Sequence, residues 1–115
     1  MIEAYTPQKD GFDVLFGSEG WQIAAITYAE QYSAENHQKL SRHMTTDEVF
    51  VLVRGEACLY TTEDGKALEA IPMEHGKVYC VKKATWHSLA ISRDAFLAVA
   101  ENAALRPEDT ERMTV

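Results

Sequence analysis

Residues 41–55 read SRHMTTDEVFVLVRG, and this stretch combines a strand pattern with the turn that ends it. Side chains alternate between the two faces of a strand, so Glu48, Phe50 and Leu52 share one face of 48–54. The valines between them share the other face. Because both faces are largely apolar, we expect this strand to be buried on both sides, with Glu48 at the mouth of a buried face.

The same pattern of short strand-like runs separated by turns extends along the chain in both directions. Gly- and Asp-containing turn signals separate short runs rich in Val, Ile, Phe, Tyr and Thr, which is typical of an all-β sandwich or barrel. The expected strands are 13–16, 21–28, 39–44, 48–54, 56–62, 67–72, 77–81, 87–91 and 95–100. One helical turn is expected at 29–35, with a loop as the alternative. We expect one domain over 1–115, with a barrel core at about 12–102 and a polar C-terminal tail at 105–115 to which no chemistry is assigned.

Length and charge narrow the class of protein further. The chain has 115 residues and a formal net charge of -7, so we expect one site and no nucleic-acid partner, because binding phosphates requires clustered Lys and Arg. No apolar run has the length that a membrane helix needs, and the first residues do not resemble a secretion signal. These features predict a cytoplasmic protein without membrane contact. Cys58 and Cys80 lie in apolar runs and are expected to be buried thiols.

Three polar residues are expected on inward faces. His87 shares a strand face with Leu89 and Ile91, and His43 ends the strand that precedes Glu48. Two imidazoles and a carboxylate are costly to bury unless they are satisfied, and one divalent cation would satisfy all three. The alternative is a core His87 bonded to the backbone and a Glu48 paired with Lys82 or Arg42. Periodicity alone favours this alternative.

Two stretches resemble the motifs of the cupin family. Residues 41–55 resemble the first motif, H-x-H, three or four residues, E, six residues, G, with His43, Glu48 and Gly55 in register. Residues 76–91 resemble the second motif, G, five residues, P-x-G, two residues, H, three residues, N, with Gly76 and His87 in register. The resemblance implies an all-β double-stranded β-helix, or jelly-roll barrel. The sequence departs from the motifs at four positions: Ser41, Lys82, Ala84 and Ile91.

The resemblance also implies a function. It implies a divalent transition metal (Fe, Mn, Ni or Zn) held inside the barrel by His43, Glu48 and His87, and a small polar ligand such as a sugar, keto acid or hydroxy acid. The fold hosts metal-dependent isomerases, epimerases and dioxygenases, and the sequence does not select among them. The alternative is a metal-free cupin that serves as a ligand binder, sensor or accessory subunit. We also expect a homodimer that pairs through 13–16 and 21–28.

Other residues carry weaker signals. Ser41 replaces one metal-binding histidine of the first motif and shares a strand face with His43. His37 is near enough in sequence to substitute for that ligand, although its polar surroundings favour solvent exposure, as do those of His75. Four aromatic residues could line a pocket, although core or dimer-interface positions are more common for such residues in small barrels: Tyr28, Tyr60, Tyr79 and Trp86.

Overall fold

The computed structural model describes residues 1–103 and 107–115, which form ten β-strands and no α-helix. The strands are β1 (Phe12–Ser18), β2 (Trp21–Thr27), β3 (Lys39–His43), β4 (Glu48–Arg54), β5 (Ala57–Thr62), β6 (Glu69–Pro72), β7 (Val78–Val81), β8 (Trp86–Ile91), β9 (Phe96–Asn102) and β10 (Thr110–Thr114). The first nine confirm the expected strands to within two residues at each end. The expected helical turn is replaced by two short 3-10 helices, η1 (Glu30–Tyr32) and η2 (Ala34–Asn36).

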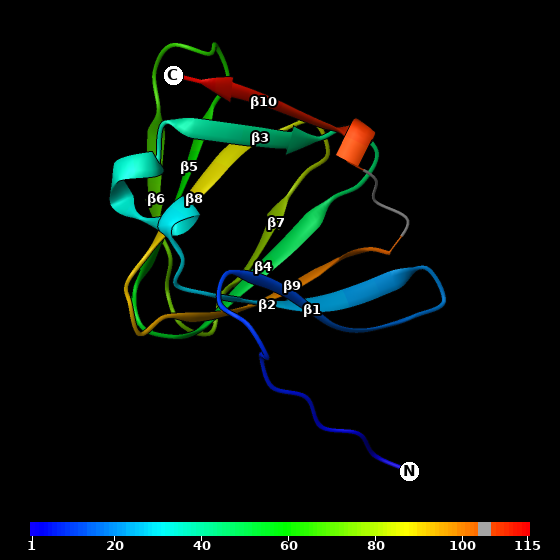
Figure 1. Cartoon of the computed structure of the whole chain (residues 1–115). Coiled ribbons are helices and arrows are strands. Elements are labelled where there is room, and N and C mark those ends of the chain that lie inside the picture. Colours follow the sequence, from blue (N-terminus) through cyan, green and yellow to red (C-terminus); the bar gives the residue numbers. More distant parts are fainter. Residues whose placement is uncertain (104–106) are drawn as a thin grey trace.

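The strands form two five-stranded antiparallel sheets (Figure 1). The first sheet has the order β1-β2-β9-β4-β7, and the second has the order β10-β3-β8-β5-β6. Neighbours in each sheet are mostly distant in sequence, as in a jelly roll. The all-β fold inferred from the spacing of the strands is therefore confirmed. Strands β4 and β9 lie inside the first sheet, and β3 and β8 lie inside the second.

The core lies between the two sheets, on the faces that the two-residue period assigns. Along β4, Glu48, Phe50 and Leu52 are buried. Full burial of an apolar side chain such as that of Phe50 or Leu52 contributes about 1.5–3 kcal/mol. The other face of β4 is more exposed than expected, because Val49 and Val51 are only half-buried and Val53 is 55% exposed. Residues from both sheets share the core: Ala24, Ile26, Phe50, Leu52, Ala57, Leu59, Met73, Leu89, Ile91, Ala95, Leu97 and Val99.

Two turns with a positive φ mark the motif positions. Gly55, between β4 and β5, has φ 82°, and a Cβ there would lie 2.6 Å from the Cα of Ala95. Ala84, which stands where the second motif has glycine, keeps the left-handed conformation at φ 66°. A side chain makes that conformation unfavourable by roughly 1–2 kcal/mol. The backbone of the second motif is therefore preserved although its glycine is not.

The C-terminal segment differs from expectation. Residues 110–114 form β10, which pairs with β3 along its whole length, instead of a polar tail without regular structure. Its polar composition is compatible with its position as an edge strand, where most side chains are exposed. Leu105 and Arg106, which the expected tail also included, lie outside the described residues.

The surface corrects two further expectations. Cys80 is exposed and Cys58 half-buried, because the outward face of edge strand β7 and that of β5 are incompletely covered. The expected dimer contact through 13–16 and 21–28 is corrected in part: β2 lies between β1 and β9, so of these two strands β1 alone is at an edge of the sheet.

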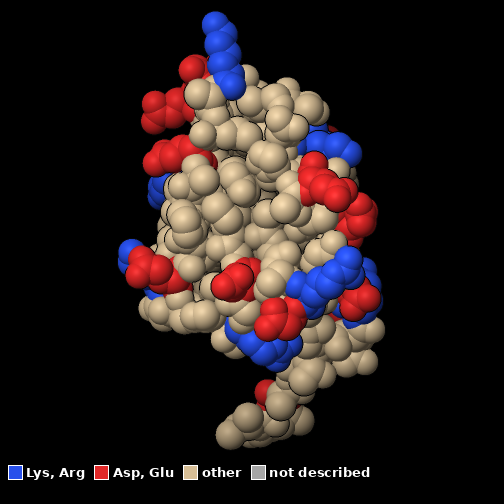
Figure 2. Space-filling model, turned by 90° about the vertical axis from the view of Figure 1, so that its left-hand side faces the viewer, with Lys and Arg blue, Asp and Glu red and all other residues tan. Residues whose placement is uncertain are grey.

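Charge on the surface is mixed. On the side of the molecule that Figure 2 shows, acidic and basic side chains are interspersed around a wide uncharged area. Such a face lacks the continuous positive charge that a polyanion requires. Within the described residues, no helix has the length and apolar character needed to traverse a membrane.

Candidate metal centre

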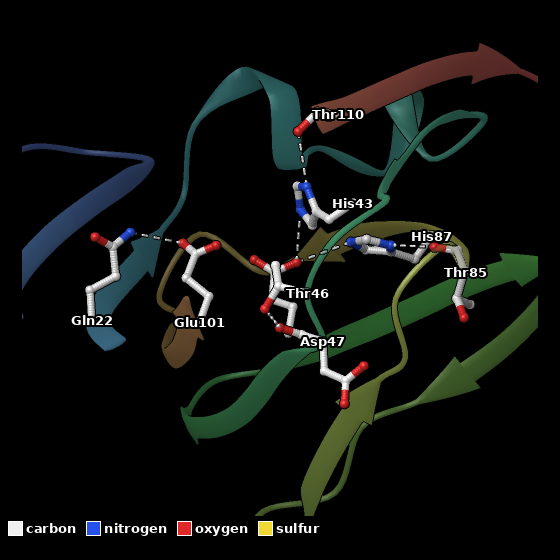
Figure 3. Close-up of polar contacts among 9 residues, drawn as sticks. Gln22, His43, Thr46, Asp47, Thr85, His87, Glu101 and Thr110 are labelled. Atoms are coloured by element: carbon white, nitrogen blue, oxygen red, sulfur yellow. Dashed lines mark hydrogen bonds and ion pairs between the residues drawn. The ribbon is translucent and has the colours of Figure 1, made fainter. Parts of the chain in front are cut away.

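Three side chains from three strands converge at one end of the barrel, and Figure 3 labels two of them, His43 and His87. Glu48 is the first residue of β4 in the first sheet, whereas His43 on β3 and His87 on β8 belong to the second sheet. The Nε2 atoms of His43 and His87 lie 3.3 and 3.2 Å from the same oxygen, Oε1 of Glu48. The side chain of His43 is 15% exposed, and the other two are more deeply buried. The site therefore spans the two sheets.

A second contact orients each imidazole. His87 Nδ1 lies 2.9 Å from the main-chain oxygen of Thr85, which is only an acceptor, so Nδ1 must carry a proton there. His43 Nδ1 lies 3.0 Å from the hydroxyl oxygen of Thr110 on β10. In both residues Nε2 is thus the nitrogen that faces Glu48.

Electrostatics favour an ionised Glu48. Burial raises the pKa of the Glu48 carboxyl, but hydrogen bonds from His43 and His87 outweigh burial and lower the pKa to about 2. The hydrogen bond to Glu48 raises the pKa of His43, although burial opposes that change. A buried carboxylate therefore keeps its charge at neutral pH, as a metal ligand must.

The two distances from Glu48 to the histidines fit ligands of a common metal ion. The three ligand atoms all lie within 4.8 Å of one another. Two ligands at about 2.1 Å from a common ion, separated by angles between octahedral and tetrahedral values, are roughly 3.0–3.4 Å apart. The Nε2–Oε1 distances of 3.2 and 3.3 Å fall in that range. Moreover, a neutral His87 that donates from Nδ1 presents a lone pair to Glu48, and a cation between them removes that conflict.

A second buried carboxylate lies beside the three, and the sequence analysis missed it. Glu101 on β9 pairs directly with Glu48 on β4 and is 6% exposed. Gln22 on β2 donates to it from Nε2 at 3.4 Å (Figure 3). Burial raises the pKa of the Glu101 carboxyl, and the charge of Glu48 raises it further. The signal was present in the alternation of Leu97, Val99 and Glu101, which places Glu101 on the core face.

Tyr32 on η1 also went unnoticed. It packs against the core, and burial is the main cause of its raised pKa, with smaller contributions from the charges of Glu48 and Glu101. Its position in a short 3-10 turn offers no periodic pattern that would have identified it.

The alternative pairing expected for Glu48 is wrong. Lys82 pairs with Asp47 at 2.6 Å, and Arg42 pairs with Glu111 at 2.6 Å. The other part of that alternative is confirmed, because His87 does bond to the backbone. It also contacts Glu48, so the two interpretations of His87 are compatible.

Ser41 lies on the strand face predicted from the two-residue period. It is the register partner of His87 in the β3–β8 pair, and it is on the same face of β3 as His43. His37, the expected substitute ligand, lies elsewhere, with its Nδ1 2.7 Å from the oxygen of Ala34 and its ring against Tyr60. The structure therefore places Ser41, and not His37, beside the three residues.

The aromatic residues and the remaining histidine have structural surroundings. Tyr28 and Tyr79 pack against the core, whereas Trp86 alternates with His87 to the outer face, 4.4 Å below the guanidinium of Arg42. Tyr60 is opposite Ser88, also on the outer face. The imidazole of His75 contacts the main-chain oxygen of Gly55 and is exposed. The core position that we favoured is confirmed for Tyr28 and Tyr79, and the dimer-interface alternative for Tyr60 and Trp86 stays a prediction.

A cavity of about 630 Å³ lies on the outer side of the second sheet. It is lined by Arg42, Trp86 and the hairpin between β5 and β6, and by none of His43, Glu48 and His87. Because the inward residues of β8 point to the other face, this cavity is distinct from the cluster.

Comparison with known proteins supports the fold. No protein-family model matches the sequence, and no curated protein matches it. Solved structures do match: Pac13, a nucleoside dehydratase from Streptomyces, has a TM-score of 0.66 and 15% identity over 99% of this chain and 92% of that chain. A cupin-2 domain protein from Shewanella frigidimarina has a TM-score of 0.62 and 16% identity, covering 84% of each chain. The TDP-fucose-3,4-ketoisomerase WlaRA from Campylobacter jejuni has a TM-score of 0.60 and 17% identity over 77% of this chain and 64% of that chain.

At these identities the similarity concerns the fold. Together with the jelly-roll topology, it shows that this chain has the fold of a small cupin domain. The resemblance inferred from residues 41–55 and 76–91 is thereby confirmed at the level of fold.

Proposed function

We propose that this protein binds one divalent transition metal through His43 Nε2, Glu48 Oε1 and His87 Nε2, and that the site acts on a small hydroxyl-bearing metabolite. The observation that carries the proposal is the convergence of two imidazole nitrogens on one buried carboxylate oxygen, at the spacing of ligands around a common ion. Two nitrogens and one carboxylate suit Fe(II), Mn(II), Ni(II) or Zn(II), and leave coordination positions open.

The chain supplies the surroundings of the site. When bound, the cation would supply Lewis acidity that polarises an oxygen of the ligand. Glu101 and Gln22 offer a carboxylate and an amide next to Glu48, and these groups suit hydrogen bonds to hydroxyls. Tyr32 adds a phenol whose pKa is raised by burial and, to a smaller extent, by the charges of both carboxylates. These polar groups favour a sugar-like ligand over an apolar one.

The structural neighbours suggest which ligands to test first. One neighbour was solved with uridine, and another, a sugar ketoisomerase, with TDP. Uridine is a nucleoside and TDP is a nucleotide, so both ligands contain a sugar ring. Nucleosides and sugar nucleotides are therefore the first ligand classes to test, and a keto acid or hydroxy acid is the next.

Metal analysis tests the proposal. Protein prepared without a histidine tag and without chelator should carry about one equivalent of metal, or should take up one equivalent of Mn(II), Fe(II), Ni(II) or Zn(II). The His87→Ala variant should lose the metal. The matched control is His75→Ala, because that imidazole is exposed and is hydrogen-bonded to the main-chain oxygen of Gly55, so its loss should leave the metal content unchanged. Retention of stoichiometric metal by His87→Ala would overturn the assignment.

A metal-free binding protein is the second candidate, and one observation favours it. The Nε2–Oε1 distances that fit a shared ion are also hydrogen-bond distances, so protonated histidines and Glu48 can satisfy one another without metal. In that case a ligand would bind to Glu101 and Gln22. Absence of uptake of all four metals by the wild-type protein would favour this candidate.

We also propose a homodimer in which two copies meet along the free edge of β1. Aromatic residues gather there: Tyr5 stacks on Phe16 at 5.0 Å, and Phe16 meets Trp21 edge-on at 5.8 Å. All three are at least 36% exposed, which is unusual for large side chains grouped together. Light scattering at micromolar concentration should give twice the mass of one chain, and Phe16→Glu should give the mass of one chain.

The cytoplasmic location expected from the sequence stays a prediction.

A further inference from the structure

The last strand of the chain reaches the candidate metal centre. Thr110 begins β10, and it is the register partner of His43 at the end of β3. Register partners point to the same face of a sheet, so the Thr110 hydroxyl lies beside the imidazole, 3.0 Å from Nδ1 (Figure 3). The contact joins residues 67 positions apart. No feature of the two cupin motifs includes it, because both motifs end before β9.

A ligand nitrogen needs a defined protonation state on the other side of its ring. If Nε2 of His43 is to bind a metal, the imidazole must be neutral and its proton must reside on Nδ1. Nδ1–H then needs an acceptor, and Thr110 Oγ1 is in position to accept. For His87 the corresponding acceptor is the main-chain oxygen of Thr85. The two histidines are thus held in the same tautomer by different kinds of group.

The position of Thr110 is well fixed. The amide of Met44 donates to the main-chain oxygen of Asp109 at 2.9 Å, immediately before Thr110. One residue after it, Glu111 pairs with Arg42. Contacts on both sides of Thr110 therefore hold β10 against the end of β3, so the hydroxyl is held in place by more than its own hydrogen bond.

We propose that Thr110 is a positioning residue. Its hydroxyl oxygen accepts a hydrogen bond from Nδ1–H of His43, and this bond directs Nε2 toward the metal. The C-terminal strand β10 thereby completes the site, although it provides no ligand. This inference rests on the proposed metal-binding function.

Three variants test the role of the hydroxyl. Thr110→Val replaces the hydroxyl by a methyl group of similar size, Thr110→Ser retains it, and Thr114→Val makes the same change at the exposed far end of the same strand. Zn(II) and Mn(II) are titrated separately into each metal-free protein. Loss of a group that orients a metal ligand weakens affinity by about 10–100-fold, and we expect at least tenfold for Thr110→Val. Thr110→Ser and Thr114→Val should bind within about twofold of wild type.

A spectroscopic measurement separates orientation from general loss of structure. In Zn(II)-loaded wild type and Thr110→Ser, the Nδ1–H proton of His43 should be visible by NMR because the hydroxyl protects it from exchange with water. In Thr110→Val that resonance should be lost or strongly broadened, whereas the Nδ1–H resonance of His87 should remain. Circular dichroism checks that each variant is folded.

The outcomes distinguish the two proposals. If wild type binds none of Mn(II), Fe(II), Ni(II) and Zn(II), the proposed function fails and this inference fails with it. If wild type binds metal and Thr110→Val binds it equally well, only the role of Thr110 is overturned. Equal weakening by Thr110→Val and Thr114→Val would likewise overturn it, because the effect would then belong to the strand and not to the hydroxyl.

Discussion

His43 and His87 approach the same oxygen of Glu48 from strands with different surroundings. His87 lies on β8, with β3 on one side and β5 on the other, and a main-chain oxygen holds its Nδ1. His43 lies on β3, next to edge strand β10, and a side-chain hydroxyl holds its Nδ1. His43 is also the more exposed of the two.

This difference has a physical consequence. No side-chain substitution can remove the acceptor of His87, because the acceptor belongs to the backbone. The acceptor of His43 depends on one residue of an edge strand, and edge strands open more readily than internal ones. The two histidines therefore have the same chemistry, but the hydrogen bond that orients His43 is more easily lost than the one that orients His87. We expect perturbations of the site to appear first at His43.

The largest effect is expected from the group that both histidines share. Glu48→Gln keeps the shape of the side chain but removes the charge that both histidines face. Metal affinity should fall by more than about a hundredfold, beyond the range for residues that only orient a ligand. Isothermal titration with Zn(II) measures it. Glu74→Gln is the control, because that carboxylate is exposed and pairs with Lys77 outside the cluster. Unchanged affinity in Glu48→Gln would mean that the two histidines do not share a metal with Glu48.

An intermediate effect is expected from pH in the metal-free protein. The raised pKa of His43 contributes stability that is present below about pH 6.5 and is lost as pH rises through the higher folded value. The Glu48 pKa of about 2 contributes stability that is present above about pH 4.5 and is lost as pH falls toward 2. The contribution of this pair is therefore greatest between about pH 4.5 and 6.5.

Urea unfolding at pH 3, 5.5 and 8.5, with chelator present, checks this dependence. His43→Gln should flatten the alkaline limb of the stability curve while the loss at acid pH persists. Saturating Zn(II) should move the maximum to higher pH, because protons compete with the metal for the imidazoles. A wild-type protein whose stability does not change between pH 5.5 and 8.5 would contradict the assigned role of His43.

The smallest effect concerns the turn that links the two histidines. The amide of Ala84 donates to the main-chain oxygen of His43 at 2.7 Å, and β8 with His87 follows directly. Since Ala84 has φ 66°, Ala84→Gly should stabilise the protein by about 1 kcal/mol. Ala70→Gly in strand β6 should instead destabilise it by roughly 0.5–1 kcal/mol. Thermal unfolding compares the two, and a destabilised Ala84→Gly would show that the turn is not strained.

The sequence was sufficient to predict the strands because most of them alternate clearly. The run from Glu48 to Arg54 identifies one inner face, and β4 begins and ends at the predicted residues. Strand β10 could not be identified in this way, because an edge strand of mixed polar residues has the composition of a loop. Its partner, β3, decides its conformation, and such pairing is not visible in local sequence.

The site was predicted to a similar extent. His43, Glu48 and His87 were found from motif spacing, and the structure brings them together. Their surroundings were not found, because Glu101 and Thr110 depend on which strands become neighbours. Glu101 faces Glu48 only because β9 pairs with β4, and Thr110 faces His43 only because β10 pairs with β3. The metal-binding role of the three residues stays a prediction until metal is measured.

The placement of Glu48 on one sheet and of both histidines on the other has a mechanical consequence. A cation held by all three would be a cross-link between the sheets, closing a loop between residues 39 positions apart at His87 and Glu48. The sheets are otherwise held together by apolar packing and by their connecting loops, so the ion could leave only as fast as the sheets separate at that end. Amide hydrogens of β4 and β8 should then exchange more slowly in the loaded protein, and the dissociation rate of the metal should follow the rate of that opening.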